Sequence, residues 1–164
     1  MRGHITLYTR LLKHFLVSWL SDVSSLGALP TYGFVLLAIL AAGNVSVFVR
    51  LLAAFCIGLL VAFAIRVVFP KPRPGASLAA LKATAGYVRL DASSFPSVHA
   101  LRASTLSSFF YEAYPSKVSF AVAVLAVVAV SYSRIYLKKH YFIDVLAGAA
   151  LGILCGYVSL KLPL

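Results

Sequence analysis

His140 and Asp144, four residues apart, are the pair in this sequence best suited to nucleophilic or acid–base chemistry. On a helix, residues four apart share a face. The carboxylate can therefore bond one imidazole nitrogen, fix the tautomer and make the other nitrogen a better nucleophile or base. Asp144 is one of only four acidic residues and lies just inside an apolar run, where an unpaired carboxylate is costly. A His–Asp pair that faces basic side chains accounts for this position.

Two other segments place basic and hydrogen-bonding side chains at the ends of apolar runs. In residues 66–74, Arg66 ends an apolar run and Arg73 follows among three prolines, which stiffen the backbone. In residues 93–99, serines and a proline precede an apolar run, as at the start of a helix, where backbone amides can bind an anion. His99 falls in the first turn of that helix. Taken alone, the arginines could be anchors at membrane-span ends, and the histidine could simply bond a loop.

The composition excludes an ordinary soluble domain. Hydrophobic residues make up 62% of the 164 residues, charged residues make up 12%, and the mean hydropathy is +0.95. The net charge is +11, but the basic residues punctuate apolar segments instead of interleaving with aromatics on a polar surface, so we expect no nucleic-acid partner. Four carboxylates offer no obvious metal site, and we expect neither a metal nor a cofactor. Cys56 and Cys155 lie in apolar runs and form no zinc or disulfide pattern.

The apolar runs predict an all-α fold, a polytopic transmembrane helix bundle that forms one domain over residues 1–164. Crossing a bilayer takes roughly 20 residues. Residues 1–26 have apolar side chains at helical spacing but are interrupted by charges, which favours an amphipathic helix in the membrane interface. A sixth span is the alternative for this segment. The five predicted spans are residues 30–42, 51–69, 95–111, 118–132 and 141–160.

The last predicted span carries a ridge of small residues, Gly148, Gly152 and Gly156, at a spacing of four. Such a ridge allows another helix to pack closely. We expect this contact to be internal, because Asp144 on the same ridge has to face the bundle interior. The same small-residue face could equally serve a homodimer.

Alternation of the spans places the loops at residues 70–94 and 134–140 on one side of the membrane. Most of the basic residues in loops lie on that side, so one face of the protein is strongly cationic. The positive-inside rule places this face in the cytoplasm of a cell-membrane protein. The residues concerned are Lys71, Arg73, Lys82, Arg89, Arg134, Lys138, Lys139 and His140.

The three segments resemble the signature of the type 2 phosphatidic acid phosphatase (PAP2) superfamily, which is K-x6-R-P, then P-S-G-H, then S-R-x5-H-x3-D. The third motif fits residues 133–144 without change. The first fits residues 66–74, with Arg66 in place of the lysine, and the second fits residues 96–99, with Val98 in place of the glycine. The resemblance covers about half of the chain.

A phosphate ester that reacts in line needs positive charge at its equatorial oxygens, a nucleophile on one side and a proton donor on the other. Arginines supply the charge through bidentate contacts, and the Ser97 hydroxyl and the Val98 amide add hydrogen bonds at a helix N-terminus. The predicted phosphate-binding residues are Arg66, Arg73, Arg134, Ser97, Val98 and Lys71.

The resemblance implies the catalytic roles. His140, oriented by Asp144, would attack phosphorus and form a phosphohistidine, while His99 would protonate the departing alcohol and later activate water. The implied substrate is a membrane lipid that carries a phosphate, such as a phospholipid or a prenyl phosphate or diphosphate, and residues 75–91 could form an interfacial lid that selects it. Many membrane relatives act on the extracytoplasmic side, against the charge bias. A phosphotransferase that uses the same phosphohistidine, or a non-catalytic protein that binds anionic lipid, are the alternatives.

Overall fold

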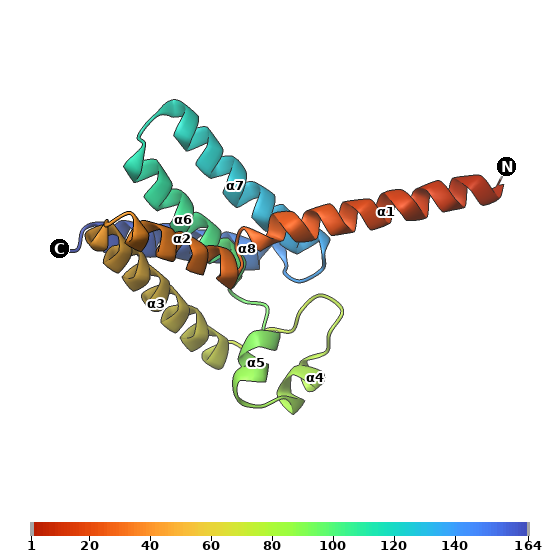
Figure 1. The fold of residues 1–164 in the computed structure, drawn as a ribbon. Helices are drawn as coiled ribbons and strands as arrows, with labels where there is room; N and C mark the ends of the chain where they lie inside the picture. The colour runs from red at the N-terminus through yellow and green to blue at the C-terminus, as the bar shows by residue number, and fades with distance from the viewer. Residues whose placement is uncertain (1, 164) are drawn as a thin grey trace.

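The computed structural model describes residues 2–163, with side chains described for residues 9–86 and 88–163. The described chain is all-helical, as predicted, and contains no strand. Its longer helices form a bundle from which α1 and the short pair α4 and α5 project (Figure 1). The helices are α1 (Arg2–Ser25), α2 (Leu29–Ala41), α3 (Val45–Val68), α4 (Leu78–Ala83), α5 (Gly86–Ala92), α6 (Val98–Ala113), α7 (Lys117–Tyr136) and α8 (Phe142–Leu160).

Each predicted helical segment is a helix in the structure, and most ends fall within a few residues of their predicted positions. The largest difference is at α3, which begins at Val45 although we predicted residue 51. The prediction treated Arg50 as the boundary of the apolar run. A long basic side chain can lay its methylene groups along an apolar surface, so one arginine does not end a helix.

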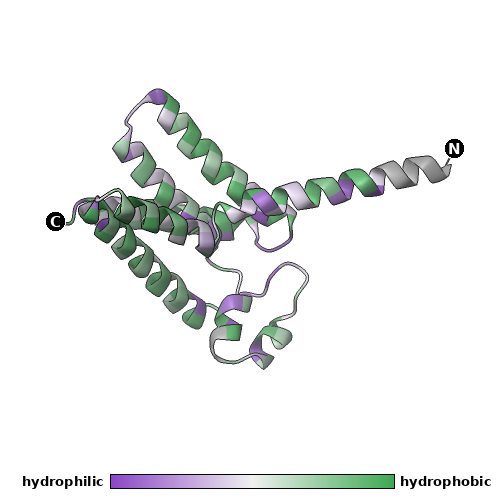
Figure 2. Cartoon of the chain, in the orientation of Figure 1, coloured by the Kyte–Doolittle hydropathy of each residue, from purple (hydrophilic) through white to green (hydrophobic). Residues whose placement is uncertain are grey.

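The prediction of five spans with an interfacial helix is not confirmed. Four stretches in the described chain are long and apolar enough to cross a membrane, namely Thr9–Ala41, Val45–Val68, Lys117–Tyr136 and Phe142–Leu160. The helix α6, predicted as a span, is not among them, because it has only 16 residues and carries Arg102 and several hydroxyl side chains. Figure 2 shows mostly hydrophobic colouring along α3 and α7.

The helix α1 contacts the rest of the chain mainly through its C-terminal end. Side chains from residue 9 to Trp19 are exposed, including Leu11, Leu12 and Phe15, whereas Leu20 and Ser24 are buried. Figure 1 shows the N-terminal part of this helix extending beyond the bundle. The segment is therefore a helix, and its amphipathic character and its position relative to a membrane stay predictions.

The bundle is centred on the contact between α6 and α8. The ridge of Gly148, Gly152 and Gly156 faces α6, and a side chain at any of these positions would press on α6. Hydroxyl groups join the two helices, because Ser104 Oγ donates to the Ala149 carbonyl at 3.0 Å and Thr105 Oγ1 to the Gly152 carbonyl at 3.1 Å. The expected internal contact is confirmed, and this ridge is not free to form a homodimer.

The α6–α8 contact predicts that Gly152→Ala destabilises the protein. An added methyl group would overlap the Leu101 carbonyl and the Ser104 hydroxyl, and backbone cannot rotate away as a side chain can. We expect a loss of roughly 1–3 kcal/mol, as for overpacked cores, measured as a lower thermal unfolding temperature in detergent. The control is Gly33→Ala in α2, where nothing lies within 4 Å of the added group. Equal unfolding temperatures for the two variants would contradict this packing.

Candidate active site

The N-termini of α6 and α8 meet at one end of the bundle. The Ser97 amide donates to the Asp144 carbonyl at 2.9 Å, and Gly148 lies directly against the Ser97 backbone. Ser97 is the N-cap of α6, and its hydroxyl accepts from the Ala100 amide at 3.4 Å. The predicted helix start is therefore present, with Ser97 as its cap and Pro96 immediately before the cap.

Backbone hydrogen bonds tie the loop after α3 to the loop before α6. The Ser94 amide donates to the Lys71 carbonyl at 2.8 Å, and the Ser94 hydroxyl donates to the Pro72 carbonyl at 3.2 Å. The Lys71 amide in turn donates to the Ser93 hydroxyl at 3.2 Å. Ser93 and Ser94 are both buried. The first and second motifs are therefore held together by a continuous set of bonds.

His140 lies in the loop between α7 and α8, which corrects the prediction that it shares a helix with Asp144. Its Nδ1 is 2.7 Å from the Ser94 carbonyl oxygen and 3.9 Å from Asp144 Oδ2. A carbonyl oxygen can only accept, so Nδ1 carries the hydrogen and donates to Ser94. The neutral ring then has its lone pair on Nε2. The group that orients His140 is the Ser94 carbonyl, not Asp144.

The surroundings of His140 keep it neutral at physiological pH. The side chain is 3% exposed, and burial lowers the pKa of His140 from its ordinary value to about 4. The positive charge of Arg134 acts in the same direction, and the hydrogen bond to Ser94 opposes it. Neutral imidazole is the form that can act as a nucleophile.

Asp144 has two other partners. Its Oδ1 is 2.6 Å from Lys71 Nζ, and its Oδ2 accepts from the Tyr141 amide at 2.8 Å, which caps the start of α8. Lys71 Nζ also lies 4.4 Å from the centre of the Tyr141 ring. The carboxylate is fully buried, and Lys71 is about one-third exposed. Lys71, predicted to bind phosphate, is the counter-ion of Asp144 in this structure.

The three predicted phosphate arginines are held in different ways. Arg66 is 5% exposed and donates to the carbonyls of Leu90 and Pro96, at 2.7 and 2.8 Å, so it braces α5 against the start of α6. Arg73 donates to the Asp91 carbonyl at 2.6 Å, and Arg134 donates to the Ser24 hydroxyl at 2.9 Å.

The Nε atoms of these three arginines are buried and make no hydrogen bond within the described part of the chain. A guanidinium has five N–H donors, and the bonds to Leu90, Pro96, Asp91 and Ser24 use only some of them, so each arginine keeps further donors for an anion. An anion with several oxygens, such as phosphate, suits a set of fixed donors of this kind.

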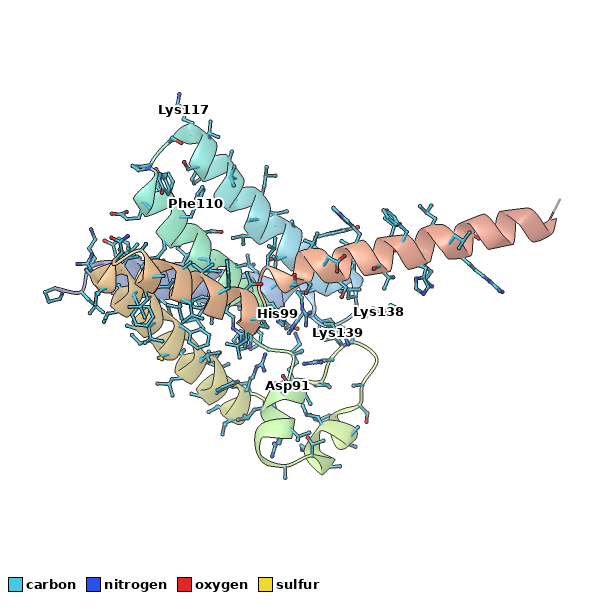
Figure 3. All side chains as sticks on the ribbon, viewed as in Figure 1. Asp91, His99, Phe110, Lys117, Lys138 and Lys139 are labelled. Carbon is cyan, nitrogen blue, oxygen red and sulfur yellow. The ribbon has the colours of Figure 1, made fainter. Side chains whose placement is uncertain are left out.

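His99 lies at the same end of the bundle, in the first turn of α6 and partly buried. Burial lowers the pKa of His99 from its ordinary value to about 3, and the positive charges of Arg134, Arg102 and Arg73 act in the same direction. Figure 3 shows His99, Asp91, Lys138 and Lys139 at this end of the molecule, with Phe110 and Lys117 at the other. The predicted cationic face is therefore present.

Residues 78–92, in the segment predicted to form a lid, make up the two short helices that project from the bundle beside this face (Figure 1). Leu81 is buried, while Leu78 and Val88 are exposed.

Several groups at the site were missed from the sequence. The Ser94 and Asp91 acceptors are backbone carbonyls. Every residue has one, so the residue type gives no indication of this role. Ser24 lies outside all three motifs, and the sequence carries no signal that would have found it. Val98 is buried, with its amide at the start of α6 as predicted.

Comparison with known proteins identifies the family. The sequence profile of the PAP2 superfamily matches residues 47–164. The chain belongs to the PAP2 superfamily. No curated protein matches the sequence significantly. The matched range contains all three motifs and excludes α1 and α2.

Two solved structures have a similar fold. One is LpxE of Aquifex aeolicus, at a TM-score of 0.73 and 22% identity, covering 90% of this chain and 87% of that one. The other is described as the first transmembrane PAP2-type phosphatidylglycerolphosphate phosphatase from Bacillus subtilis. It has a TM-score of 0.67 and 24% identity, covering 88% of this chain and 75% of that one. The all-helical PAP2 fold therefore extends over most of the present chain.

The hydrogen bond to Ser94 predicts the behaviour of His140 in Asp144→Asn. Because the Ser94 carbonyl fixes the tautomer, the variant should retain hydrogen on Nδ1. In both proteins the ring should titrate well below the ordinary value, near pH 4 in the wild type. Nitrogen NMR of histidine-labelled protein measures both properties, with His140→Gln assigning the signal. A switch of tautomer in Asp144→Asn would show that the carboxylate orients the ring after all.

Proposed function

We propose that this PAP2 protein is a metal-independent phosphatase that hydrolyses a membrane lipid phosphate through a phosphohistidine on His140. The observation that carries the proposal is the state of His140, a neutral ring whose Nδ1 is engaged by Ser94 and whose Nε2 keeps its lone pair. Arginines surround it, and the buried carboxylate beside it is already paired with Lys71. A nucleophile in such a positive environment suits an anionic, electrophilic substrate.

In the first step, Nε2 of His140 attacks phosphorus while the bond from phosphorus to the alcohol oxygen breaks. The negative charge of the bound phosphate opposes the burial and the arginine charges that lower the pKa of His99, and so favours its protonated form. Protonated His99 then gives its proton to the alcohol oxygen, and the lipid leaves as an alcohol. Arg73 and Arg134 stabilise the charge on the equatorial oxygens. Arg66 uses one hydrogen of each terminal nitrogen for the carbonyls of Leu90 and Pro96, so the second hydrogen on each remains for the phosphate.

In the second step, water attacks phosphorus and the bond from phosphorus to Nε2 breaks. His99, now neutral, takes a proton from the water as it attacks, which releases inorganic phosphate and restores both histidines. The N-terminus of α6 adds the helix dipole and the Val98 amide to the stabilisation of the anion, while the Ser97 amide is already bonded to the Asp144 carbonyl.

The position of the site supports a lipid as the substrate. The nucleophile and the arginines lie at the ends of helices that are apolar enough to span a membrane, where a headgroup can arrive laterally while its chains stay in the bilayer. The B. subtilis structure is described as a phosphatidylglycerolphosphate phosphatase, and the same reaction class on a phospholipid or prenyl phosphate is the proposal for this chain. The basic loops favour a cytoplasmic site.

Phosphotransfer uses the same first step and differs only in the acceptor, which would be an alcohol in place of water. A protein that only binds anionic lipid would have no use for a histidine held as a neutral nucleophile. Inorganic phosphate release, measured against transfer product on a panel of lipid phosphates, separates the three functions.

The proposed nucleophile predicts which variants form a phosphoenzyme. Wild type, quenched rapidly after reaction with labelled phosphate ester, should carry acid-labile, base-stable label, and His140→Ala should carry none. His99→Ala should still be labelled by a nitrophenyl phosphate, whose leaving group needs no proton, and should then hydrolyse slowly. His14→Ala, on the exposed part of α1, is the matched control and should behave as wild type. Label on His140→Ala, or none on wild type, would refute the assignment.

The arginine site also predicts that activity persists in excess chelator, because guanidinium groups neutralise the phosphate. No group of three or more metal-ligating side chains occurs among the described residues. Phosphate release from one lipid phosphate, assayed with chelator and with added magnesium, measures this directly. Loss of activity with chelator that magnesium restores would replace the proposed mechanism with a metal-assisted one.

A further inference from the structure

The turn between α1 and α2 contacts the site from outside the three motifs. Ser24, at the end of α1, is 4% exposed, and its hydroxyl accepts a hydrogen bond from Arg134 Nη1 at 2.9 Å. Three residues later, the Gly27 carbonyl accepts from Arg102 Nη1 at 3.4 Å. Both residues lie before the range that the PAP2 profile matches. The turn is therefore bonded to two basic side chains, Arg134 and Arg102, at the end of the bundle where the site lies.

Gly27 also lies directly against the backbone of His99. A Cβ atom at position 27 would be 2.5 Å from the His99 carbonyl oxygen and about 3 Å from its carbonyl carbon and Cα. All three atoms are backbone, so no side-chain rotation could make room. A glycine is needed here for close approach, and the backbone on which it rests carries the proposed proton donor.

We propose that the α1–α2 turn is a positioning element of the active site, in which Ser24 sets the orientation of the Arg134 guanidinium and Gly27 sets the position of His99. The inference rests on the proposed function for the role of His99. The Ser24 part can be tested by anion binding alone. Neither residue touches the reacting atoms, so both act through the groups they hold.

The two contacts affect different steps. A guanidinium with one nitrogen held by a hydroxyl loses less freedom when its remaining donors bind phosphate, so removing the hydroxyl should weaken anion binding. Displacing His99 should instead impair protonation of the leaving group and activation of water, leaving attack by His140 on an activated ester intact. Residues of one turn thus set the orientation of Arg134 and the position of His99.

The Ser24 contact is tested by titrating inorganic phosphate calorimetrically into purified full-length protein. Ser24→Ala should bind phosphate roughly three- to tenfold more weakly, the size expected for the net contribution of one typical hydrogen bond, and Ser24→Thr, which keeps the hydroxyl, should restore binding. Ser25→Ala is the matched control, because its exposed hydroxyl bonds only the Asp22 carbonyl. Equal affinities for Ser24→Ala, Ser25→Ala and wild type would overturn this part.

The Gly27 contact is tested by comparing two rates in Gly27→Ala. Turnover of an alkyl phosphate should fall about tenfold or more, a part of the roughly 10²- to 10⁴-fold that a general acid contributes, while single-turnover phosphorylation by nitrophenyl phosphate stays near wild type. Gly33→Ala, with open space around the added group, should change neither rate. Parallel loss of both rates with the unfolding temperature would show a purely structural role. Absence of any phosphoenzyme in wild type would instead refute the proposed function, leaving the phosphate titration of Ser24→Ala as the deciding result.

Discussion

The close approach of α6 and α8 is the contact on which the rest of the site depends. Glycines at every fourth position of α8 remove the side chains that would separate the two helices. The Ser97 amide can then reach the Asp144 carbonyl, so that the first turns of α6 and α8 lie next to each other. His99 comes from one of these turns, and His140 comes from the loop that enters the other. A wider separation would leave two histidines without a common substrate.

The arginine side chains of the site keep their positive charge because the groups that accept their hydrogen bonds are neutral. Arg66 and Arg73 donate to backbone carbonyls and Arg134 to a hydroxyl, while Lys71 takes the one fully buried carboxylate nearby. These bonds hold the guanidinium groups without cancelling their charge, and the carboxylate that lies near Arg73, with Asp91 Oδ2 at 3.8 Å from Arg73 Nη2, is exposed to solvent. An anion with several oxygens can then bind to donors that are already ordered, so little further conformational entropy is lost. Asp144 bonds Lys71 and the Tyr141 amide, and so serves the site as a counter-ion and helix cap.

Sequence reasoning was most successful where periodicity and motif spacing decide the outcome. It predicted the long helices, the cationic end of the bundle and the packing of the glycine ridge inside the chain. It was wrong about the partner of His140, because a backbone carbonyl such as that of Ser94 has no residue signature. The pair of Lys71 and Asp144 joins residues far apart in the chain, which spacing alone cannot show. The span count is not confirmed at α6, a helix of 16 residues whose side chains are largely buried against its neighbours.

The central claim is that one anion site lies between His140 Nε2 and the arginines of the three motifs. An experimental structure of the protein with bound vanadate, which adopts the five-coordinate geometry of phosphoryl transfer, tests it most directly. The account predicts vanadium bonded to Nε2 of His140, its equatorial oxygens contacting Arg73 and Arg134, and His99 on the opposite side. Vanadate bonded to His99, or held at another surface with the Nε2 position unoccupied, would contradict it.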